Sequence, residues 1–229
     1  MSTILCIETS TNVCSVALTA DGMILHHCED FEGRNHATLL SGFIKQCLDH
    51  MSRHEMRLDA VAVSIGPGSY TGLRIGLSEA KGLAYALDIP LIGIDTLKIL
   101  ATEAMFAVDL EPGSLLAPMI DARRMEVFTA VYDESLQTVV PPAPMILDAG
   151  SFAPQLAGDA PVYFMGNGAD KAETVITSPR AHFIHGLSPL ATTMMPLAEM
   201  ALLRGDTLDL AYSTPAYLKE FQATKPKGK

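Results

Sequence analysis

Short apolar runs separated by polar and turn residues open the chain. Runs over residues 4–7, 15–19 and 23–28 have the length of strands, and Asp21-Gly22 between the last two predicts a hairpin. Apolar residues then recur at three- and four-residue spacing, which predicts an amphipathic helix over residues 36–51. These positions are Leu39, Leu40, Phe43, Ile44, Cys47 and Leu48. The pattern therefore begins with three strands and a helix.

Strands and helices alternate after this opening. Residues 60–65 form an apolar run without polar alternation, which is typical of a strand buried on both faces. A glycine-rich loop leads from this run into a helix that ends near Leu87. Residues 90–94 predict a further strand, and a helix follows from about Thr96.

The second half of the chain repeats the same order. Strands are predicted over 115–120, 126–132, 136–140, 161–165 and 181–184. Short helices are predicted after Gly150 and from about Ala169. A last helix, capped by Ser188, is predicted to end near Leu203. Two copies of β-β-β-α-β-α-β-α are typical of the α/β, actin-like, sugar-kinase and Hsp70 (ASKHA) superfamily, which binds nucleotide between two lobes. We expect an N-terminal lobe over 1–108, a C-terminal lobe over 109–203, and a segment 204–229 that packs back on the first lobe.

Composition narrows the class of protein. The chain has 229 residues, 48% hydrophobic and 18% charged, as expected of a folded globular protein. Its mean hydropathy of +0.24 indicates either a large core or an apolar surface that binds a partner. No apolar run reaches the roughly 18 residues of a membrane span, and no secretory leader is recognised, so a cytoplasmic protein is expected. A net charge of −10 argues against an extended basic surface that binds nucleic acid. Cys6, Cys14, Cys28 and Cys47 form no C-x-x-C pair and are expected to be free thiols.

The glycine-rich loop Gly66 to Gly76 is the most distinctive motif. A strand, a glycine loop and a helix can cradle a phosphate with backbone amides, and Glu8, Gly66, Gly68 and Ser69 are secondary candidates for such a site. No Lys-Ser/Thr pair follows Gly72, which excludes a Walker A loop, and the glycine spacing does not fit G-x-G-x-x-G. The alternative is a tight turn in which glycines allow close packing. In either case Ser69 or Thr71 would cap the helix.

Small residues form a stripe along the helix that follows this loop. Gly72, Gly76, Ala80 and Ala84 recur every four residues. Because glycine within a helix costs roughly 1 kcal/mol relative to alanine, a packing reason is expected. The stripe either packs against the protein's own sheet or lets a partner helix approach.

A charged cluster, Asp121-Ala122-Arg123-Arg124-Met125-Glu126, lies between two predicted strands. Such a cluster is usually a hairpin turn with local salt bridges, each worth less than about 1 kcal/mol. The alternative is a polar contact with a partner protein or with tRNA phosphate, for which the candidates are Arg74, Asp121, Arg123 and Arg124. The basic end of the chain, Lys225 to Lys229, is expected to be a tail.

Five stretches, taken together, resemble the TsaB (YeaZ) family over nearly the whole chain. They are Ile7-Glu8-Thr9-Ser10-Thr11, the glycine loop 66–76, Ala80-Lys81-Gly82-Leu83-Ala84, Ile120-Asp121-Ala122-Arg123-Arg124 and Pro215-Ala216-Tyr217-Leu218-Lys219. The resemblance implies an actin-like fold and a part in making N6-threonylcarbamoyladenosine in tRNA. In that family TsaB is an inactive paralogue of the transferase TsaD, with which it pairs, and the ATPase TsaE joins them.

Three departures separate this chain from a TsaD-type catalyst. Such proteins carry two metal-binding histidines four residues apart on the first long helix, but here His36 is followed by Leu40. They also follow their first strand with Glu-Thr-Ser-Cys-Asp, whereas here Thr11-Asn12 replaces Cys-Asp, and the chain is much shorter. The resemblance thus implies a dimerisation subunit without catalytic residues, cofactor or metal.

The same resemblance implies an interface made by the two long helices of the N-terminal lobe. TsaD would bind this face, a homodimer would use it in the absence of TsaD, and tRNA would be reached only through the complex, with no membrane involved. The interface residues predicted in this way are Leu39, Phe43, Cys47, Leu73, Gly76, Leu77, Ala80 and Ala84.

Two enzyme classes stand as alternatives. An ATP-dependent small-molecule kinase or ATPase of the actin-like superfamily would need carboxylates for Mg²⁺, and Glu8 with Asp121 is the plausible pair. A metallopeptidase would need the histidine that Leu40 replaces. No serine lies in a G-x-S-x-G elbow, so a serine hydrolase finds no support.

Overall fold

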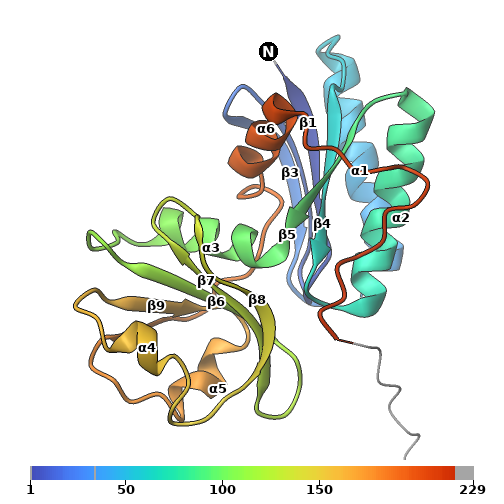
Figure 1. The fold of residues 1–229 in the computed structure, drawn as a ribbon. Helices are drawn as coiled ribbons and strands as arrows, with labels where there is room; N and C mark the ends of the chain where they lie inside the picture. Colours follow the sequence, from blue (N-terminus) through green and yellow to red (C-terminus); the bar gives the residue numbers. More distant parts are fainter. Residues whose placement is uncertain (1, 34, 220–229) are drawn as a thin grey trace, which may run out of the picture.

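The computed structural model describes residues 2–33 and 35–219, which form two lobes, each built on a five-stranded sheet (Figure 1). The N-terminal sheet has the order β3-β2-β1-β4-β5. Its strands are β1 (Thr3–Glu8), β2 (Cys14–Ala20), β3 (Met23–Asp30), β4 (Ala60–Gly66) and β5 (Leu91–Asp95). The C-terminal sheet has the order β10-β9-β6-β7-β8. Its strands are β6 (Leu115–Asp121), β7 (Glu126–Asp133), β8 (Thr138–Ile146), β9 (Val162–Met165) and β10 (Ala181–Ile184).

The two sheets are copies of one topology. β1 pairs antiparallel with β2 and parallel with β4, and β6 pairs antiparallel with β7 and parallel with β9. The predicted α/β duplication is therefore confirmed.

Helices cover both faces of the N-terminal sheet. α1 (His36–Arg53) and α2 (Tyr70–Leu87) pack on one face, where Leu40 and Leu77 meet the odd-numbered apolar residues of β1. α3 (Thr96–Ala107) and α6 (Met195–Arg204) pack on the other face. α3 also buries Leu97 and Leu100 against the C-terminal sheet, so this helix joins the two cores (Figure 1). The remaining helices, α4 (Ala153–Leu156) and α5 (Ala169–Glu173), belong to the C-terminal lobe.

Two predicted boundaries are wrong. Ser188 does not cap the last helix: α6 begins at Met195, with Pro196 in its first turn and Met194 at the N-cap. β8 begins at Thr138 rather than at Leu136, whose positive φ of 59° belongs to a turn, and it continues to Ile146. Prolines do not end this strand, because it lies at the edge of the sheet, where a backbone N–H is dispensable.

The chain returns to the N-terminal lobe after α6. The Leu208 amide donates to the Leu91 carbonyl (2.7 Å), and the Ala216 amide donates to the Ile65 carbonyl (2.7 Å). Lys81 Nζ donates to the Ser213 carbonyl (2.6 Å). The predicted tail Lys225–Lys229 lies outside the described residues. Within the described part of the chain, no helix has the length and apolarity needed to cross a membrane.

Candidate functional site

A cleft of about 460 Å³ lies where the two lobes meet. The N-terminal lobe contributes the loop after β1 and the glycine loop, and the C-terminal lobe contributes the β6–β7 turn. The remaining side of the cleft is lined by the segment that returns to the N-terminal lobe after α6, hereafter the returning segment, through Ala216, Tyr217, Leu218 and Lys219. The other lining residues are Ser10, Thr11, Asn12, Pro67, Gly68, Ser69, Tyr70, Thr71, Leu73, Ile120, Asp121, Ala122, Arg123, Phe128 and Asn167.

Close packing explains the glycines of the loop. A Cβ on Gly68 would lie 2.2 Å from the Ser10 carbonyl oxygen, and a Cβ on Gly72 would lie 2.1 Å from the Thr9 carbonyl oxygen. The Ser69 amide donates to the same Ser10 carbonyl (2.6 Å), while Ser69 Oγ accepts from the Gly72 amide (3.2 Å) and caps α2. The loop is thus a tight turn held against the end of β1, and Ser69 rather than Thr71 is its cap.

Glu8 lies beneath this loop and does not line the cleft. Its side chain is fully buried, and Oε1 accepts hydrogen bonds from the Ser10 amide (2.5 Å) and Ser64 Oγ (3.1 Å). Burial raises the pKa of Glu8 to about 7, and the hydrogen bonds from Ser10 and Ser64 only partly offset this. Within the described residues, Glu8 Oε2 and Ser10 Oγ have no hydrogen-bond partner.

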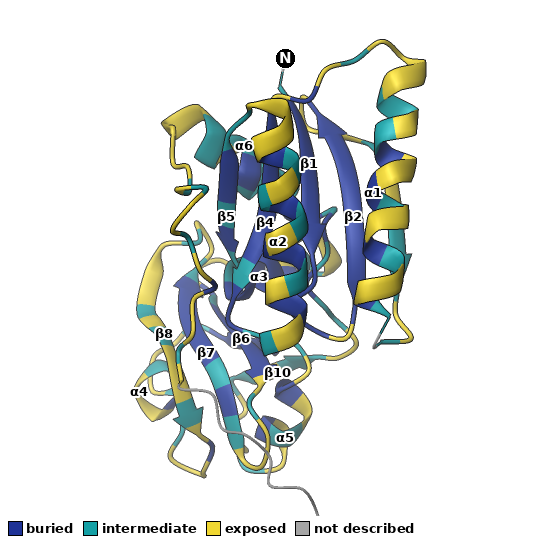
Figure 2. Cartoon of the chain, turned by 90° about the vertical axis from the view of Figure 1, so that its right-hand side faces the viewer, coloured by how far each residue is buried: buried dark blue, intermediate teal, exposed yellow. Residues whose placement is uncertain are grey.

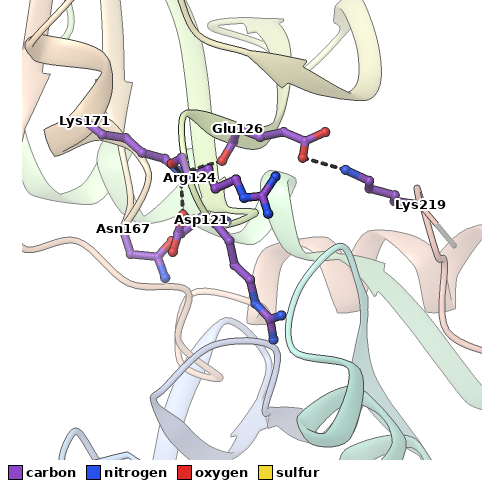
Figure 3. A network of polar contacts seen from close by, with 7 residues as sticks. Asp121, Arg124, Glu126, Asn167, Lys171 and Lys219 are labelled. Carbon is purple, nitrogen blue, oxygen red and sulfur yellow. Dashed lines mark hydrogen bonds and ion pairs between the residues drawn. The ribbon is translucent and has the colours of Figure 1, made fainter. Parts of the chain in front are cut away.

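Asp121 is held by a polar network at the β6–β7 turn (Figure 3). Lys171 on α5 forms an ion pair with its carboxylate, and Lys171 Nζ also donates to the carbonyls of Arg124 (2.8 Å) and Glu126. Asn167 Oδ1 accepts from the Asp121 amide (2.8 Å). The prediction that Glu8 and Asp121 form a cation-binding pair is not supported, because Glu8 is enclosed and Asp121 is already paired.

The predicted local salt bridges of this turn are also wrong. The partners come from distant segments: Lys171 binds Asp121, and Lys219 forms an ion pair with Glu126 (2.6 Å) (Figure 3). Arg123 and Arg124 instead adopt positive φ values of 70° and 50°, and within the described residues their guanidinium groups have no ion-pair partner. Arg123 lines the cleft.

Arg74 fastens the returning segment to α2. Its Nε donates to the Tyr217 hydroxyl (2.9 Å), and its guanidinium lies 4.2 Å from the centre of the Tyr70 ring. Lys219 bonds Glu126 on the other lobe, so the segment ties both lobes across the cleft. The sequence does not predict that Arg74 and Lys219 connect the returning segment to the two lobes, because their partners lie far away in the chain.

The small-residue stripe faces this chain's own sheet. A Cβ on Gly76 would lie 2.2 Å from Thr9 Oγ1, and Ala80 and Ala84 are fully buried. Six residues predicted to contact a partner therefore lie in the core instead, which corrects that prediction for each of them. They are Cys47, Leu73, Gly76, Leu77, Ala80 and Ala84. Leu39 and Phe43 are half-buried.

A groove of about 700 Å³ runs between the outer faces of α1 and α2. Figure 2 shows exposed residues along the outer faces of both helices. Ser41 Oγ on α1 donates to Glu79 Oε1 on α2 (2.8 Å) across the helix pair. The lining residues are Ala37, Ile44, Arg74, Ile75, Ser78, Glu79, Gly82, Leu83 and Ala86.

The two positions compared with TsaD metal ligands have structural roles here. Leu40 is buried in the core, and His36 is hydrogen-bonded through Nε2 to the Val13 carbonyl (3.2 Å). As the described side chains stand, no three His, Cys, Asp or Glu residues are arranged to hold a metal ion.

Comparison with known proteins gives consistent matches along the chain. The family model "TsaD: tRNA N6-adenosine threonylcarbamoyltransferase" matches residues 30–216. The tRNA threonylcarbamoyladenosine biosynthesis protein TsaB of Bacillus subtilis (strain 168) is 32% identical over 72% of this chain and 71% of its own length. The protein of the same name from Escherichia coli (strain K12) is 30% identical over 97% of this chain and 96% of its own. The structure of YeaZ from Pseudomonas aeruginosa has a TM-score of 0.78 at 30% identity and covers 95% of this chain and 100% of that one.

Proposed function

The chain belongs to the TsaB family of tRNA threonylcarbamoyladenosine biosynthesis proteins, and we propose that it acts as a cytoplasmic, non-catalytic subunit that binds and supports the TsaD transferase. The groove between α1 and α2 is the observation that carries this proposal. It lies on the exposed side of the helix pair, while the opposite side of both helices packs on the sheet.

The chemistry of the groove suits a helix of a partner protein. Ile75 and Leu83 are only half-buried, and Gly82 and Ala86 present little side chain, so apolar residues of another helix can approach closely. Arg74 and Glu79 give the groove charges of both signs, which fix the orientation of a docked helix. In the absence of TsaD, a second copy of this chain would occupy the same groove and form a homodimer.

The cleft gives additional support to a role without chemistry of its own. Its glycine loop is pressed against the backbone of residues 9 and 10, and Asp121, the acidic residue among its described lining residues, is paired with Lys171. TsaE and tRNA would then be engaged through the complex rather than by this subunit alone.

Binding to TsaD from the same organism tests the proposal. Ala86→Arg introduces a charge at an exposed groove position with only a small helix-propensity penalty, and we expect it to weaken binding by at least about tenfold, which is about 1.4 kcal/mol. Gln46→Arg adds the same charge to the exposed part of α1 outside the groove and should bind as wild type does.

Three outcomes would contradict this account. They are no association of the wild-type protein with TsaD, equal loss of binding in both variants, and no loss in either. Sizing of the isolated protein with the same two variants tests whether the homodimer uses the groove: Ala86→Arg should shift it to monomer, and Gln46→Arg should not.

A further inference from the structure

Arg74 lies between the groove and the cleft and connects the two. Its side chain lines the groove between α1 and α2. Its Nε donates to the hydroxyl of Tyr217 (2.9 Å), and its guanidinium lies 4.2 Å from the centre of the Tyr70 ring. Both tyrosines line the cleft, and their ring centroids lie 5.2 Å apart. One guanidinium is therefore shared by the groove and by two sides of the cleft.

The returning segment runs beside α2 (Figure 1) and is held there mainly by polar contacts. Within residues 211–219, all of which the structure describes, Pro215 is the one buried residue. The Ala216 amide donates to the Ile65 carbonyl, and a Cβ on Gly66 would lie 2.9 Å from the Ala216 carbonyl oxygen. A segment with few buried apolar contacts and exposed hydrogen bonds opens at low cost in free energy. The segment can therefore exchange between an attached state, which lines the cleft, and a released state.

The Arg74 guanidinium has hydrogen-bonding capacity left for a partner. Nε donates to Tyr217, whereas no carboxylate of the described residues forms an ion pair with the two terminal nitrogens. Glu79, the other charged residue of the groove lining, already accepts from Ser41 Oγ (2.8 Å). Arginine binds a carboxylate through two parallel N–H bonds. The groove therefore offers its free charge to an acidic side chain of a docked helix.

We propose that Arg74 couples occupation of the groove to attachment of the returning segment, an inference that rests on the proposed function. An acidic side chain of the docked partner helix pairs with the terminal nitrogens of Arg74. This pair holds the guanidinium where Nε reaches Tyr217 and the charge lies over the Tyr70 ring. The partner thereby stabilises the attached state, and by linkage the attached state binds the partner more tightly.

Backbone hydrogen exchange of the full chain, alone and saturated with TsaD, tests the coupling. The Ala216 amide, bonded to the Ile65 carbonyl, reports the attached state. We expect TsaD to slow exchange in a peptide over residues 213–219 by at least about fivefold. Tyr217→Phe removes the hydroxyl that Arg74 binds but leaves the groove side chains unchanged, so TsaD should still bind without slowing exchange. Tyr212→Phe removes an exposed hydroxyl from the same segment and should behave as wild type does.

The affinity for TsaD gives the reciprocal measurement. Tyr217→Phe should weaken binding by the same factor of about five, although Tyr217 lies in the cleft and not in the groove. In an Arg74→Lys background, which keeps the charge but removes Nε, Tyr217→Phe should weaken binding no further.

The outcomes separate this inference from the proposed function. If TsaD binds the wild-type chain but leaves exchange over residues 213–219 unchanged, the coupling is overturned and the proposed function stands. Equal slowing in wild type and Tyr217→Phe, or equal loss of affinity in Tyr217→Phe and Tyr212→Phe, also overturns the coupling. If TsaD does not bind the wild-type chain, both the proposed function and the coupling fail.

Discussion

The buried carboxyl of Glu8 should make the stability of this protein depend on pH, and Glu8→Gln should remove that dependence. Glu8 is fully enclosed beneath the glycine loop, and burial raises its pKa from 4.5 to about 7. The folded protein therefore holds the proton more tightly than the unfolded chain does. The stabilisation is fully present below pH 4.5 and is lost as the pH rises through 7.

The size of the effect follows from the two pKa values. Between pH 5 and pH 8, Glu8 alone lowers the free energy of unfolding by about 2.5 kcal/mol, at 1.36 kcal/mol for each pKa unit. The glutamine oxygen can still accept from the Ser10 amide and Ser64 Oγ, so the variant keeps these hydrogen bonds but carries no charge at either pH. Glu8→Gln should therefore gain about 2.5 kcal/mol relative to wild type on going from pH 5 to pH 8.

Urea unfolding of both proteins at pH 5 and pH 8 measures this difference, and melting temperatures should shift by roughly 5–10 °C in the same direction. Glu111→Gln makes the same amide substitution at an exposed position and serves as the control. If the stability difference between Glu8→Gln and wild type is the same at both pH values, Glu8 does not titrate between them and its pKa is not raised.

Three further pairs of substitutions test which contacts stabilise the glycine loop and the β6–β7 turn. Gly72→Ala should destabilise the protein by more than about 2 kcal/mol in urea unfolding, because the added Cβ would lie 2.1 Å from the Thr9 carbonyl oxygen. Gly82→Ala in the same helix places its Cβ in open space and should instead stabilise the protein by about 0.5–1 kcal/mol. Equal effects of the two substitutions would contradict close packing at Gly72. Ser69→Ala removes the cap of α2 and should lower the free energy of unfolding by about 1 kcal/mol, whereas Thr71→Ala should have a smaller effect; the reverse order would identify Thr71 as the cap. Lys171→Met removes the ammonium group that donates to Asp121 and to the carbonyls of Arg124 and Glu126, and it should cost about 2 kcal/mol. Lys45→Met, which breaks an exposed pair with Asp49, should cost under about 1 kcal/mol; equal costs would show that the turn network is no stronger than a surface pair.

Local sequence patterns predicted those elements whose ends are set by neighbouring residues. α2 spans Tyr70–Leu87 as predicted, since Ser69 caps its start and Asp88 ends it in a left-handed conformation. The order of strands and helices along the chain in both lobes also followed from the repeated pattern, whereas the order of the strands within each sheet came from the structure. The start of α6 was not readable in the same way, because Ser188 looks like a cap but the helix begins at Met195.

The candidate site depended on contacts between distant segments. Small residues at helical spacing indicate that another segment packs closely on the helix, but they do not identify that segment. Here Gly76 packs on Thr9 of this chain and not on a partner. Asp121 and Lys171 are fifty residues apart, and Tyr217 meets Arg74 only because the chain returns across the first lobe. No periodicity connects such residues, so the cleft wall and the turn network required the structure.

The proposal that this chain supports the TsaD transferase, and does not itself catalyse the transfer, can be tested by reconstitution. Its most direct test is threonylcarbamoyl transfer to tRNA with purified TsaD and TsaE, with and without this chain, together with calorimetry of the isolated chain with ATP and Mg²⁺. We expect transfer to require this chain, to fall with Ala86→Arg, and to persist with Gln46→Arg, while the isolated chain shows no ATP turnover. Turnover of ATP by the isolated chain, or full transfer in its absence, would contradict the account.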